Sequence, residues 1–467
     1  GLGDVYKRQG QGRPIDRRGL KPPRVTHPEQ TENDTMWDFS TDPEFQAKLD
    51  WIDRFLVEEV EPLDVLYPSV SVVYNTRHAK SRAILKPLQE KVRQQKLWAC
   101  HLDPHLGGEG YGQLKLALMN ERLGRSLWAP TVFGTAAPDT GNAEILAMFG
   151  TIEQKARYLQ PLLDGDIVSC FSMTEPQGGA DPKVFTTRAV RDGDHWVISG
   201  EKWYSSNARY AEFILVLAVT DPDAPIQRRM SMFIVPRETP GLEIIRNVPH
   251  MGERLEMDEA TEGYLRYDNV RVPLDHMLGE LGGGFAVAQA RLGGGRIHHA
   301  MRTVGQCQRA LDMMCERSLS RYTQGTQLAE KGTVQAMLAD TQIELEQFRL
   351  LVLKTAWIID GSHGDSRQAR GHIAMVKVAM AKLYYEVVRR AIHLHGSLGA
   401  TFETPLAYMW NSVPTMGLAD GPTEVHQVTV ARELLRKYKP AAGIFPSEHL
   451  PPKIAAARDR YAHILDG

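Results

Sequence analysis

The stretch RAVRDGDHWVISGEKWYSSNA, Arg188–Ala208, decides the fold, because its pattern predicts two strands joined by a tight turn. Asp192-Gly193 is typical of hairpin turns, and the β-rich residues after it suit the returning strand. Strands that follow strands without intervening helices predict a mainly antiparallel sheet. Further runs typical of strands lie at 211–220, 230–236 and 261–273.

Helical patterns flank this strand region on both sides. Before it, from about residue 41 to 165, apolar residues recur at three- and four-residue spacing, and Asp42-Pro43 is typical of a helix start. After it, the segments 333–360 and 375–396 are apolar over much of their circumference, and Gly396 closes the second. The order helices, strands, helices predicts an α+β protein with a helical bundle at its C-terminal end.

Composition narrows the class of protein. The chain has 467 residues and a formal net charge of −2, which gives no reason to expect nucleic acid or a membrane surface as partner. Its four cysteines form no CxxC pair or disulfide framework, which favours a reducing compartment. No spacing of His and Cys residues indicates a metal. Without an apolar leader, we expect a cytoplasmic protein, or a mitochondrial or peroxisomal one if the source is eukaryotic.

Several polar or glycine-rich stretches are candidates for chemistry, and each also has a plain structural interpretation. GGEGYG (107–112) and GELGGGF (279–285) could contact phosphates, but neither joins a strand to a helix in a dinucleotide-binding unit, so we interpret both as loops. CFSMTEPQGGADPK (170–183) offers polar groups and two glycines that allow a ligand to approach the backbone, or it is an ordinary turn.

The strand GEKWYSSNA (200–208) combines two aromatic residues with two hydroxyls. Strict alternation would place Trp203 and Ser205 on one face and Tyr204 and Ser206 on the other. One face would then suit a flat ligand, or the strand is simply half buried.

LGGGRIHHAMRTVG (292–305) brings glycines, arginines and histidines to an expected helix start, where backbone N–H groups and Arg296 could meet an anion. His298 and His299 point about 100° apart on a helix, which suits a shared metal poorly, and a polar helix face is the alternative.

LADGPTEVHQ (418–427) places Asp420 just before an expected helix. Pro422 suits the first helical position and Gly421 the residue before it. On this stretch alone, a structural turn residue is the simpler interpretation of Asp420.

Taken together and in order, these segments resemble the acyl-CoA dehydrogenase superfamily over about residues 42–437. CFSMTEPQGGAD is similar to the family's TEPxxGSD loop, GEKWYSSNA to GxKxWITN, HLHGSLGATFETP to QxxGGxGY, and DGPTEVHQ to EGTxEIQ. DNVRVP and ALDMMCERSLSRYTQG resemble two further segments. The resemblance implies an N-terminal helical domain, a middle antiparallel β domain and a C-terminal four-helix bundle, here expected at 36–167, 168–280 and 281–440, with a disordered or non-native extension at 1–35 and a tail at 441–467.

The resemblance also implies FAD as cofactor and α,β-desaturation of an acyl-CoA, with a carboxylate taking the α-proton while a hydride passes to flavin N5. Asp420 falls at the position of the family's catalytic base. The positions that match flavin contacts are Phe171, Met173, Thr174, Ala180, Tyr204, Ser205, Ser206, Arg321, Gln324, His393, Leu394, Gly396, Pro422 and Glu424. The positions that match the acyl-CoA site are Ala180, Gly294, Gly295, Arg296, Ile297 and Gly421.

Within the superfamily, APDTGN (137–142), GRIHHAMRTVG and LADGPTEVH resemble a long-chain branch whose members are sometimes fused to a phosphotransferase-like domain. This resemblance implies a long, branched or 4-hydroxylated acyl chain, electron-transfer flavoprotein as partner and a homodimer or homotetramer. Asp420 is one methylene shorter than the family's Glu, so the helix start or the substrate must shift. Two alternatives are a flavin oxidase similar to nitroalkane oxidases, which also use Asp, and a non-catalytic acyl-CoA-binding homologue.

Overall fold

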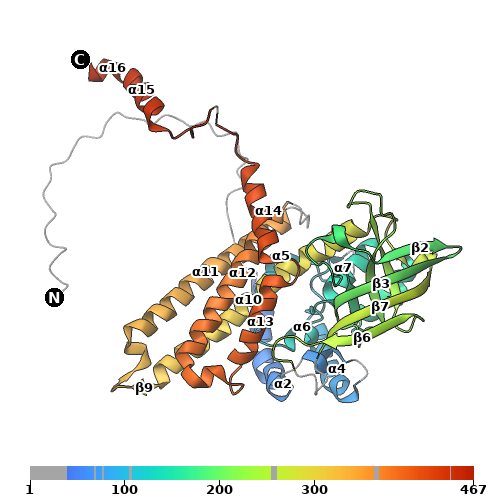
Figure 1. Cartoon of the computed structure of the whole chain (residues 1–467). Helices are drawn as coiled ribbons and strands as arrows, with labels where there is room; N and C mark the ends of the chain where they lie inside the picture. The colour runs from blue at the N-terminus through green and yellow to red at the C-terminus, as the bar shows by residue number, and fades with distance from the viewer. Residues whose placement is uncertain are drawn as a thin grey trace. The chain divides into compact units, whose positions relative to one another are not determined.

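The structure, a computed structural model, describes residues 39–67, 70–75, 78–104, 108–253, 260–361, 368–441 and 443–466. The extension expected at 1–35 lies outside these ranges. Figure 1 shows the predicted order along the chain: helices up to Leu163, strands from Ser169 to Leu278, and helices again from Gly284.

The N-terminal helices begin where the sequence predicts. Asp42 caps the first helix, its carboxylate accepting a hydrogen bond from the N–H of Phe45 at 2.8 Å, and Pro43 is the first helical residue. The predicted apolar stripe is buried, as at Leu49 and Ile52. The helices are α1 Pro43–Phe55, α2 Glu61–Leu66, α3 Val70–Tyr74, α4 Ala79–Gln94, α5 Gly112–Leu123, α6 Ala129–Val132, α7 Asp139–Phe149, α8 Ile152–Gln154 and α9 Gln160–Leu163, with π-helical turns at Leu56–Val60 and Lys155–Leu159.

The strand region forms one sheet with the order β6-β7-β3-β2-β4-β5-β8, and β1 pairs with β4. The predicted hairpin is β2–β3, with Asp192 opposite His195. The sheet is mainly antiparallel, as expected, although β1 and β2 both run parallel to β4. The strands are β1 Ser169–Ser172, β2 Arg188–Asp192, β3 His195–Ser206, β4 Phe213–Val219, β5 Met230–Pro236, β6 Leu242–Val248, β7 Glu262–Pro273 and β8 Met277–Leu278.

Strand β4 is buried along its whole length, because each of its faces enters a different apolar cluster. Phe213 and Leu215 pack with Ile145 and Leu146 of α7. Ile214 and its neighbours on the other face pack with residues of β3 and β7. The sheet is therefore covered by helix α7 on one side and folds onto its own strands on the other.

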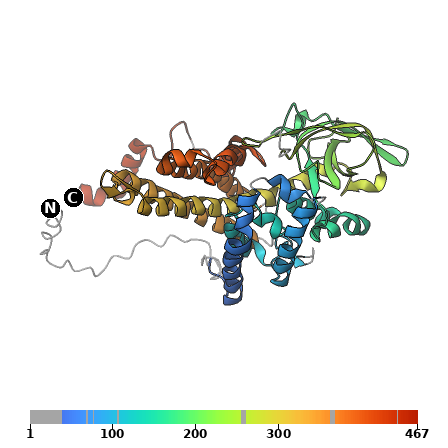
Figure 2. The same cartoon turned by 90° about the horizontal axis from the view of Figure 1, so that it is seen from below.

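Three long helices, α10, α11 and α12, run in alternating directions in the C-terminal region, and the shorter α13 and α14 pack against α12 (Figures 1 and 2). Gly396, with φ at +66°, ends α12 as predicted. The elements are α10 Gly284–Ser320, β9 Tyr322–Thr323, β10 Thr326–Gln327, α11 Gly332–Gly361, α12 Arg370–His395, α13 Leu406–Leu418, α14 Thr423–Leu435, α15 Leu450–Arg460 and α16 Ala462–Leu465.

Helix α10 connects the two halves of the fold. Val287, near its start, packs in the cluster that includes β4 and α7. Ile297, three turns later, packs in the helical cluster that joins α1, α5, α11 and α12. The segment between them therefore lies where the sheet, the N-terminal helices and the C-terminal helices meet.

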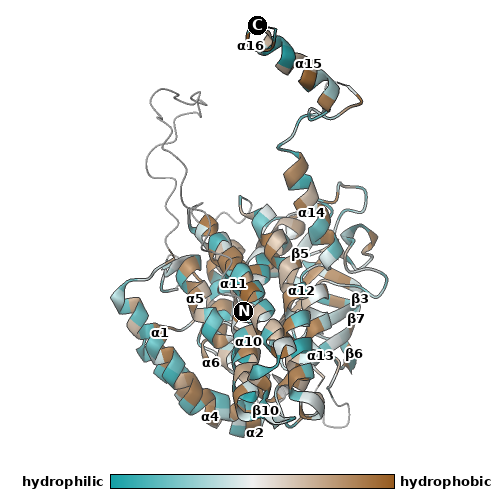
Figure 3. Cartoon of the chain, turned by 90° about the vertical axis from the view of Figure 1, so that its left-hand side faces the viewer, coloured by the Kyte–Doolittle hydropathy of each residue, from teal (hydrophilic) through white to brown (hydrophobic). Residues whose placement is uncertain are grey.

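Figure 3 shows apolar and polar residues alternating along the visible helices, as expected for helices with one buried face. Helices α15 and α16 contain no buried residue. Within the described ranges, no helix is both long and apolar enough to cross a membrane. Cys100, Cys170, Cys307 and Cys315 are all free thiols.

Candidate active site

Asp420 lies in the tight connection between α13 and α14. Ala419 caps the end of α13 and Pro422 caps the start of α14, so only Asp420 and Gly421 span the gap. Their φ angles are +56° and +104°, a conformation that glycine adopts freely and that Asp tolerates better than most residues. The helix starts at Thr423, so Pro422 is its N-cap and the prediction that it is the first helical residue was wrong by one position.

Two side chains hold the backbone of Asp420. Arg296 of α10 donates from Nε to the carbonyl oxygen of Asp420 at 2.8 Å, and His426 Nε2 lies 3.3 Å from the same oxygen. The carboxylate Oδ2 lies 3.5 Å from Nε2 of His299, also on α10. The turn is therefore anchored on one side to α10 and on the other to α14.

The surroundings keep Asp420 ionised. Burial raises the pKa of its carboxyl, but His299 and the cations Arg291, Arg296 and Lys377 outweigh burial and hold that pKa below its usual value. Burial lowers the pKa of His299 to about 4, so His299 is neutral at neutral pH and the arginines and the lysine stabilise the carboxylate there.

Lys377 is buried in α12 and donates from Nζ to the carbonyl oxygen of Met416, near the end of α13. Burial lowers its pKa to about 8, whereas the charge of Asp420 raises it. This lysine therefore fixes the end of the helix that leads into the Asp420 turn.

The glycines of the GGGR stretch lie inside α10, three turns from its start, which corrects the expectation of an anion site at a helix start. Their N–H groups belong to the helix, because α10 runs without a break from Gly284 to Ser320. A side chain at Gly295 would place its Cβ 3.1 Å from Oδ2 of Asp420, and one at Gly294 would lie 2.7 Å from Oε2 of Glu144. The two carboxyl groups therefore lie directly against the backbone of α10, because neither glycine has a side chain.

Both histidines of this stretch are more buried than a polar helix face would be. His298 is buried, and its Nε2 has no hydrogen-bond partner in the described part of the chain. Ile297 is also fully buried in the helical core. Of the four α10 positions expected at the acyl-CoA site, Ile297 therefore contributes to packing.

Arg291 connects this region to the first strand of the sheet. Its guanidinium lies 4.0 Å from the ring centre of Phe171 in β1, and its Nε donates to Oδ1 of Asn142 at 2.9 Å. Asn142 in turn donates to the hydroxyl of Ser169 at 2.8 Å. Phe171, an expected flavin contact, is thus close to the residues around Asp420.

A buried ion pair shapes the loop after β1. The Lys202 ammonium lies 2.9 Å from Oε1 of Glu175 and donates to the carbonyl oxygen of Met173 at 2.7 Å. The N–H of Trp203 donates to the carbonyl oxygen of Thr174 at 2.8 Å. Met173 and Thr174 are half-buried, whereas Ala180 at the end of the loop is exposed.

A β-bulge breaks the alternation predicted for GEKWYSSNA. Lys202 pairs with Leu265 and Ser205 with Gly263, so β3 has one residue more than β7 in this interval. Tyr204 takes the strain with φ at +53°, and its ring stacks on Trp203 at 5.3 Å and 15°. The prediction that these two rings lie on opposite faces was therefore wrong.

The two hydroxyls beyond the bulge have different environments. Ser205 is buried, and its oxygen lies 2.8 Å from the hydroxyl of Ser172 in β1. Ser206 donates to Oε2 of Glu262 at 2.9 Å, and the other oxygen of Glu262 lies 3.3 Å from Nε2 of His250. The hydrogen bond that His250 donates to Glu262 raises the pKa of His250.

The remaining expected cofactor positions lie away from Asp420, except Pro422 and Glu424, which follow it in the sequence. Arg321 caps the end of α10 and is exposed, as is Gln324 in the β9–β10 turn. From Arg296 to Ser320, α10 rises by about 36 Å. His393, Leu394 and Gly396 lie at the end of α12, and Glu424 is exposed in the first turn of α14. Within one chain, the residues at the end of α10 and at the end of α12 therefore do not meet Asp420.

The residues of the bulge fit a flat heteroaromatic cofactor such as FAD. Half of Tyr204 is exposed although it stacks on a second ring, and Nε1 of Trp203 is a buried donor without an acceptor in the described residues. Gly179 leaves the neighbouring backbone uncovered by a side chain, with Thr174 as its contact. A ring system with polar edges would use both the exposed face and the unpaired donor.

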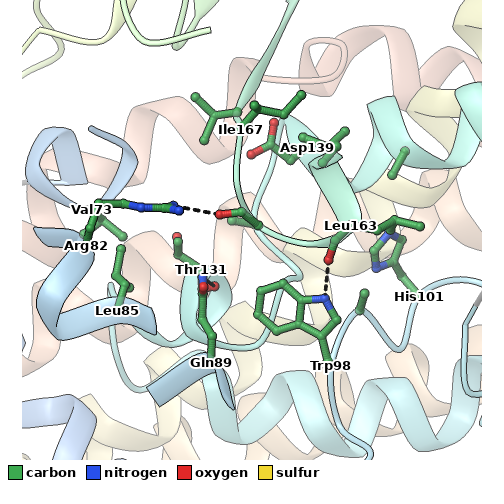
Figure 4. Close-up of a pocket in the computed structure, with 17 residues that line it drawn as sticks. Val73, Arg82, Leu85, Gln89, Trp98, His101, Thr131, Asp139, Leu163 and Ile167 are labelled. Atoms are coloured by element: carbon green, nitrogen blue, oxygen red, sulfur yellow. Dashed lines mark hydrogen bonds between the residues drawn. The ribbon is translucent and has the colours of Figure 1, made fainter. Parts of the chain in front are cut away.

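A separate cavity of about 50 Å³ lies between α4 and α7 (Figure 4). Trp98 and Arg82 line this cavity. Trp98 donates to the carbonyl oxygen of Leu163 at 2.6 Å, and Arg82 donates to the carbonyl oxygen of Gly165 at 2.8 Å. Asp420 does not line it. The cavity has room for a few water molecules and not for an acyl-CoA.

Comparison with known proteins agrees with this architecture. The N-terminal, middle and C-terminal domains of acyl-CoA dehydrogenases match residues 43–166, 170–270 and 282–435. A protein named probable acyl-CoA dehydrogenase FadE2, from Mycobacterium tuberculosis, is 42% identical over 76% of this chain and 86% of its own length. The chain belongs to the acyl-CoA dehydrogenase family.

Solved acyl-CoA dehydrogenases share the fold over most of the chain. A protein from Mycobacterium abscessus assigned to this family is 37% identical, with a TM-score of 0.77 over 86% of this chain and all of that one. Butyryl-CoA dehydrogenase from Megasphaera elsdenii is 25% identical, with a TM-score of 0.73 over 86% of this chain and all of that one. Acyl-CoA dehydrogenases are FAD-dependent oxidoreductases, and homotetramers are typical of them.

Some relatives in the acyl-CoA dehydrogenase family are much longer than this chain. Acyl-CoA dehydrogenase family member 10 of Mus musculus is 40% identical over 76% of this chain but only 33% of its own length. Acyl-CoA dehydrogenase family member 11 of Homo sapiens is 38% identical over 76% of this chain and 45% of its own length. The chain spans less than half of these two relatives.

Sequence reasoning missed several residues that surround Asp420. Glu144, Arg291, Lys377 and His426 approach it or its neighbours from α7, α10, α12 and α14. Arg291 stands two residues before the glycine run, and His426 belongs to the DGPTEVHQ stretch, so the sequence could have pointed to both. No local pattern marks Glu144 or Lys377, because their relevance depends on helices far apart in sequence.

Proposed function

We propose that this protein is an FAD-dependent acyl-CoA dehydrogenase in which Asp420 is the base that removes the α-proton. One observation carries the proposal: an ionised carboxylate lies on the tight α13–α14 turn, directly against Gly295 of α10. A base shorter than Glu requires an acyl chain that lies nearer to the turn.

Arg296 and His426 position the base through its backbone carbonyl, so the carboxylate and the N–H of Asp420 stay free for the substrate. The N–H is suited to hold the thioester oxygen, which gains charge as the α-proton leaves. His299 is neutral and lies beside the carboxylate, so it adds no negative charge that would favour protonation of Asp420. The product of this step is Asp420 carrying the proton.

FAD would be held by Phe171, Met173, Thr174 and the Tyr204–Ser206 bulge. When bound, it supplies the two-electron acceptor for the hydride that leaves the β-carbon. Arg321 and Gln324, with His393 to Gly396, lie too far along the helices to join this group in the same chain. We infer that they contact the FAD of a neighbouring copy in a homodimer or homotetramer, and that Pro422 and Glu424 approach the nucleotide end.

We also infer a long, branched or 4-hydroxylated acyl-CoA as substrate and electron-transfer flavoprotein as acceptor. The shorter base supports a substrate that differs from a simple straight acyl chain. A flavin oxidase acting on nitroalkanes is the competing activity, because it would also use an aspartate.

The test is an anaerobic screen of the FAD-loaded protein against acyl-CoAs of increasing length and branching, with loss of flavin absorbance as the readout. We expect at least one acyl-CoA to bleach the flavin and nitroethane to leave it unchanged. Bleaching by nitroethane and by no acyl-CoA, together with oxygen consumption when nitroethane is added in air, would replace the proposal with the oxidase activity. Protein that purifies without flavin and cannot be loaded would contradict both activities.

A further inference from the structure

His299 lies beside the carboxylate that the proposed reaction protonates. Its Nε2 is 3.5 Å from Oδ2 of Asp420, so the contact joins α10 to the turn between α13 and α14. An N–H group that faced an ionised carboxylate would approach its oxygen to about 2.7–2.9 Å. The longer separation fits an Nε2 atom that carries no hydrogen and is free to accept one.

The other groups around Asp420 offer no comparable acceptor. His426 turns its Nε2 to the backbone carbonyl oxygen of Asp420, at 3.3 Å, and not to the carboxylate. The cations that lower the pKa of Asp420 have no lone pair for a proton, and they are Arg291, Arg296 and Lys377. Of these described neighbours, His299 is therefore the one that can take a proton from the carboxyl group.

A proton is no better placed on Asp420 than on His299. Burial raises the pKa of Asp420, but His299 and the nearby cations outweigh burial and hold that pKa below its ordinary 3.8. Burial lowers the pKa of His299 to about 4. A proton passes between groups with such similar pKa values at little cost, because one pKa unit is about a tenfold change in the equilibrium. The transfer also leaves an imidazolium beside a carboxylate, which attract each other.

Asp420 has to lose its proton before a second acyl group can react. The bound product would lie against its carboxyl group, because the α-carbon has just given up the proton there. His299 exposes 23% of its side-chain surface, compared with 17% for Asp420. A proton on His299 therefore has a way to water that does not lead back past the carboxyl group.

We propose that His299 is a second catalytic residue, which takes the proton from Asp420 and passes it to water. In this step the O–H bond of Asp420 breaks as an N–H bond forms at Nε2 of His299, so the carboxylate is regenerated and the imidazole becomes an imidazolium. The step moves no electrons, and water then accepts the proton from the imidazolium. The inference rests on the proposed function and adds the fate of the proton to it.

The experiment follows two signals in anaerobic stopped-flow mixing of the FAD-loaded protein with the best acyl-CoA, in weak buffer with a pH-indicator dye. Loss of flavin absorbance reports removal of the α-proton, and the dye reports release of the proton to water. The variant is His299→Gln, which cannot accept a proton, and the matched control is His298→Gln on the next residue of α10. His298 points about 100° away from His299 on the helix.

We expect the parent and His298→Gln to release the proton as fast as the flavin is reduced. In His299→Gln the flavin should be reduced at a rate close to that of the parent, but proton release should lag behind by about tenfold or more. A merely structural role would slow both signals together. Proton release that keeps pace with flavin reduction in His299→Gln would overturn the proposal.

Infrared difference spectra of the parent, before and after anaerobic reduction, give a readout that needs no variant. We expect no C=O band of a protonated carboxyl group that shifts on isotopic labelling of aspartate, since the proton has moved to His299. Such a band in the parent would show that the proton stays on Asp420 and would also overturn the proposal. If no acyl-CoA bleaches the parent, the proposed function fails together with this inference, whereas bleaching with the proton left on Asp420 contradicts only the role of His299.

Discussion

Replacing Lys202 with Met should lower the free energy of unfolding by about 3 kcal/mol, because it leaves the Glu175 carboxylate buried without its cation. Both side chains are almost completely buried, with 0% and 1% of their surfaces exposed. Removing one partner of such a pair typically costs 3–5 kcal/mol. Glu175 keeps hydrogen bonds from the N–H groups of Thr186 and Thr187, at 2.7 and 3.1 Å, which favours the lower end of that range.

Thermal denaturation at fixed protein concentration measures this effect. A loss of about 3 kcal/mol should lower Tm by roughly 6–12 °C, at 2–4 °C for each kcal/mol. Lys91→Met is the matched control, because Lys91 and Glu59 form an exposed pair at 2.5 Å that contributes at most about 1 kcal/mol. We also expect Lys202→Met to bind less FAD, since Lys202 holds the carbonyl of Met173 in the candidate flavin loop.

The double variant Glu175→Gln/Lys202→Met separates pairing from packing. Its loss should be smaller than the sum of the two single losses by about 1.5 kcal/mol or more, because neither charge is then left alone. Equal Tm values for Lys202→Met and Lys91→Met would refute the reasoning that this pair stabilises the loop.

Three further outcomes follow from the site. Gly295→Ala removes a glycine from a helix interior, so Tm should hold or rise, but its Cβ would lie 3.1 Å from Oδ2 of Asp420 and displace the carboxylate, which should slow flavin reduction by about 10–100-fold. An unchanged rate would mean that the position of this carboxylate does not limit the reaction. Arg296→Met removes a cation that lowers the pKa of Asp420, so that pKa should rise and the acid limb of the pH–rate profile should move to higher pH. An acid limb that stays in place in stopped-flow rates would argue against Asp420 as the group that titrates. Burial raises the pKa of Glu144 to about 8 from an ordinary 4.5, so between these pH values the native state binds more protons than the unfolded state. The free energy of unfolding of the parent, compared with that of Glu144→Gln, should therefore fall from about pH 5 to 8. A difference between the two proteins that stays constant in urea titrations over this range would contradict this.

Local sequence patterns predicted the elements that depend on local physics. The spacing of apolar residues located α1, α11 and α12, and the Asp192-Gly193 pair located the hairpin, because a helix stripe or a tight turn is encoded within a few residues. The same reasoning placed Asp420 in a turn before a helix. The catalytic meaning of that turn came from the resemblance of the whole chain and not from the turn itself.

Features that depend on distant partners could not be predicted in this way. The bulge at Tyr204 arises because β3 and β7 differ by one residue between two pairings, and β7 lies some sixty residues away. The glycine run inside α10 is stable because flanking residues pack on two cores, which outweighs the low helix propensity of glycine. Glu144 meets Gly294 only after α7 and α10 have packed together.

The most direct test of the central claim compares the parent with Asp420→Asn in anaerobic stopped-flow mixing with the best acyl-CoA substrate. Asn tolerates the positive φ of this position and keeps the shape of Asp, so FAD content and Tm should match the parent. We predict that flavin reduction slows by about 10²–10⁴-fold, the usual contribution of a general base. Reduction of Asp420→Asn at the rate of the parent would contradict Asp420 as the base.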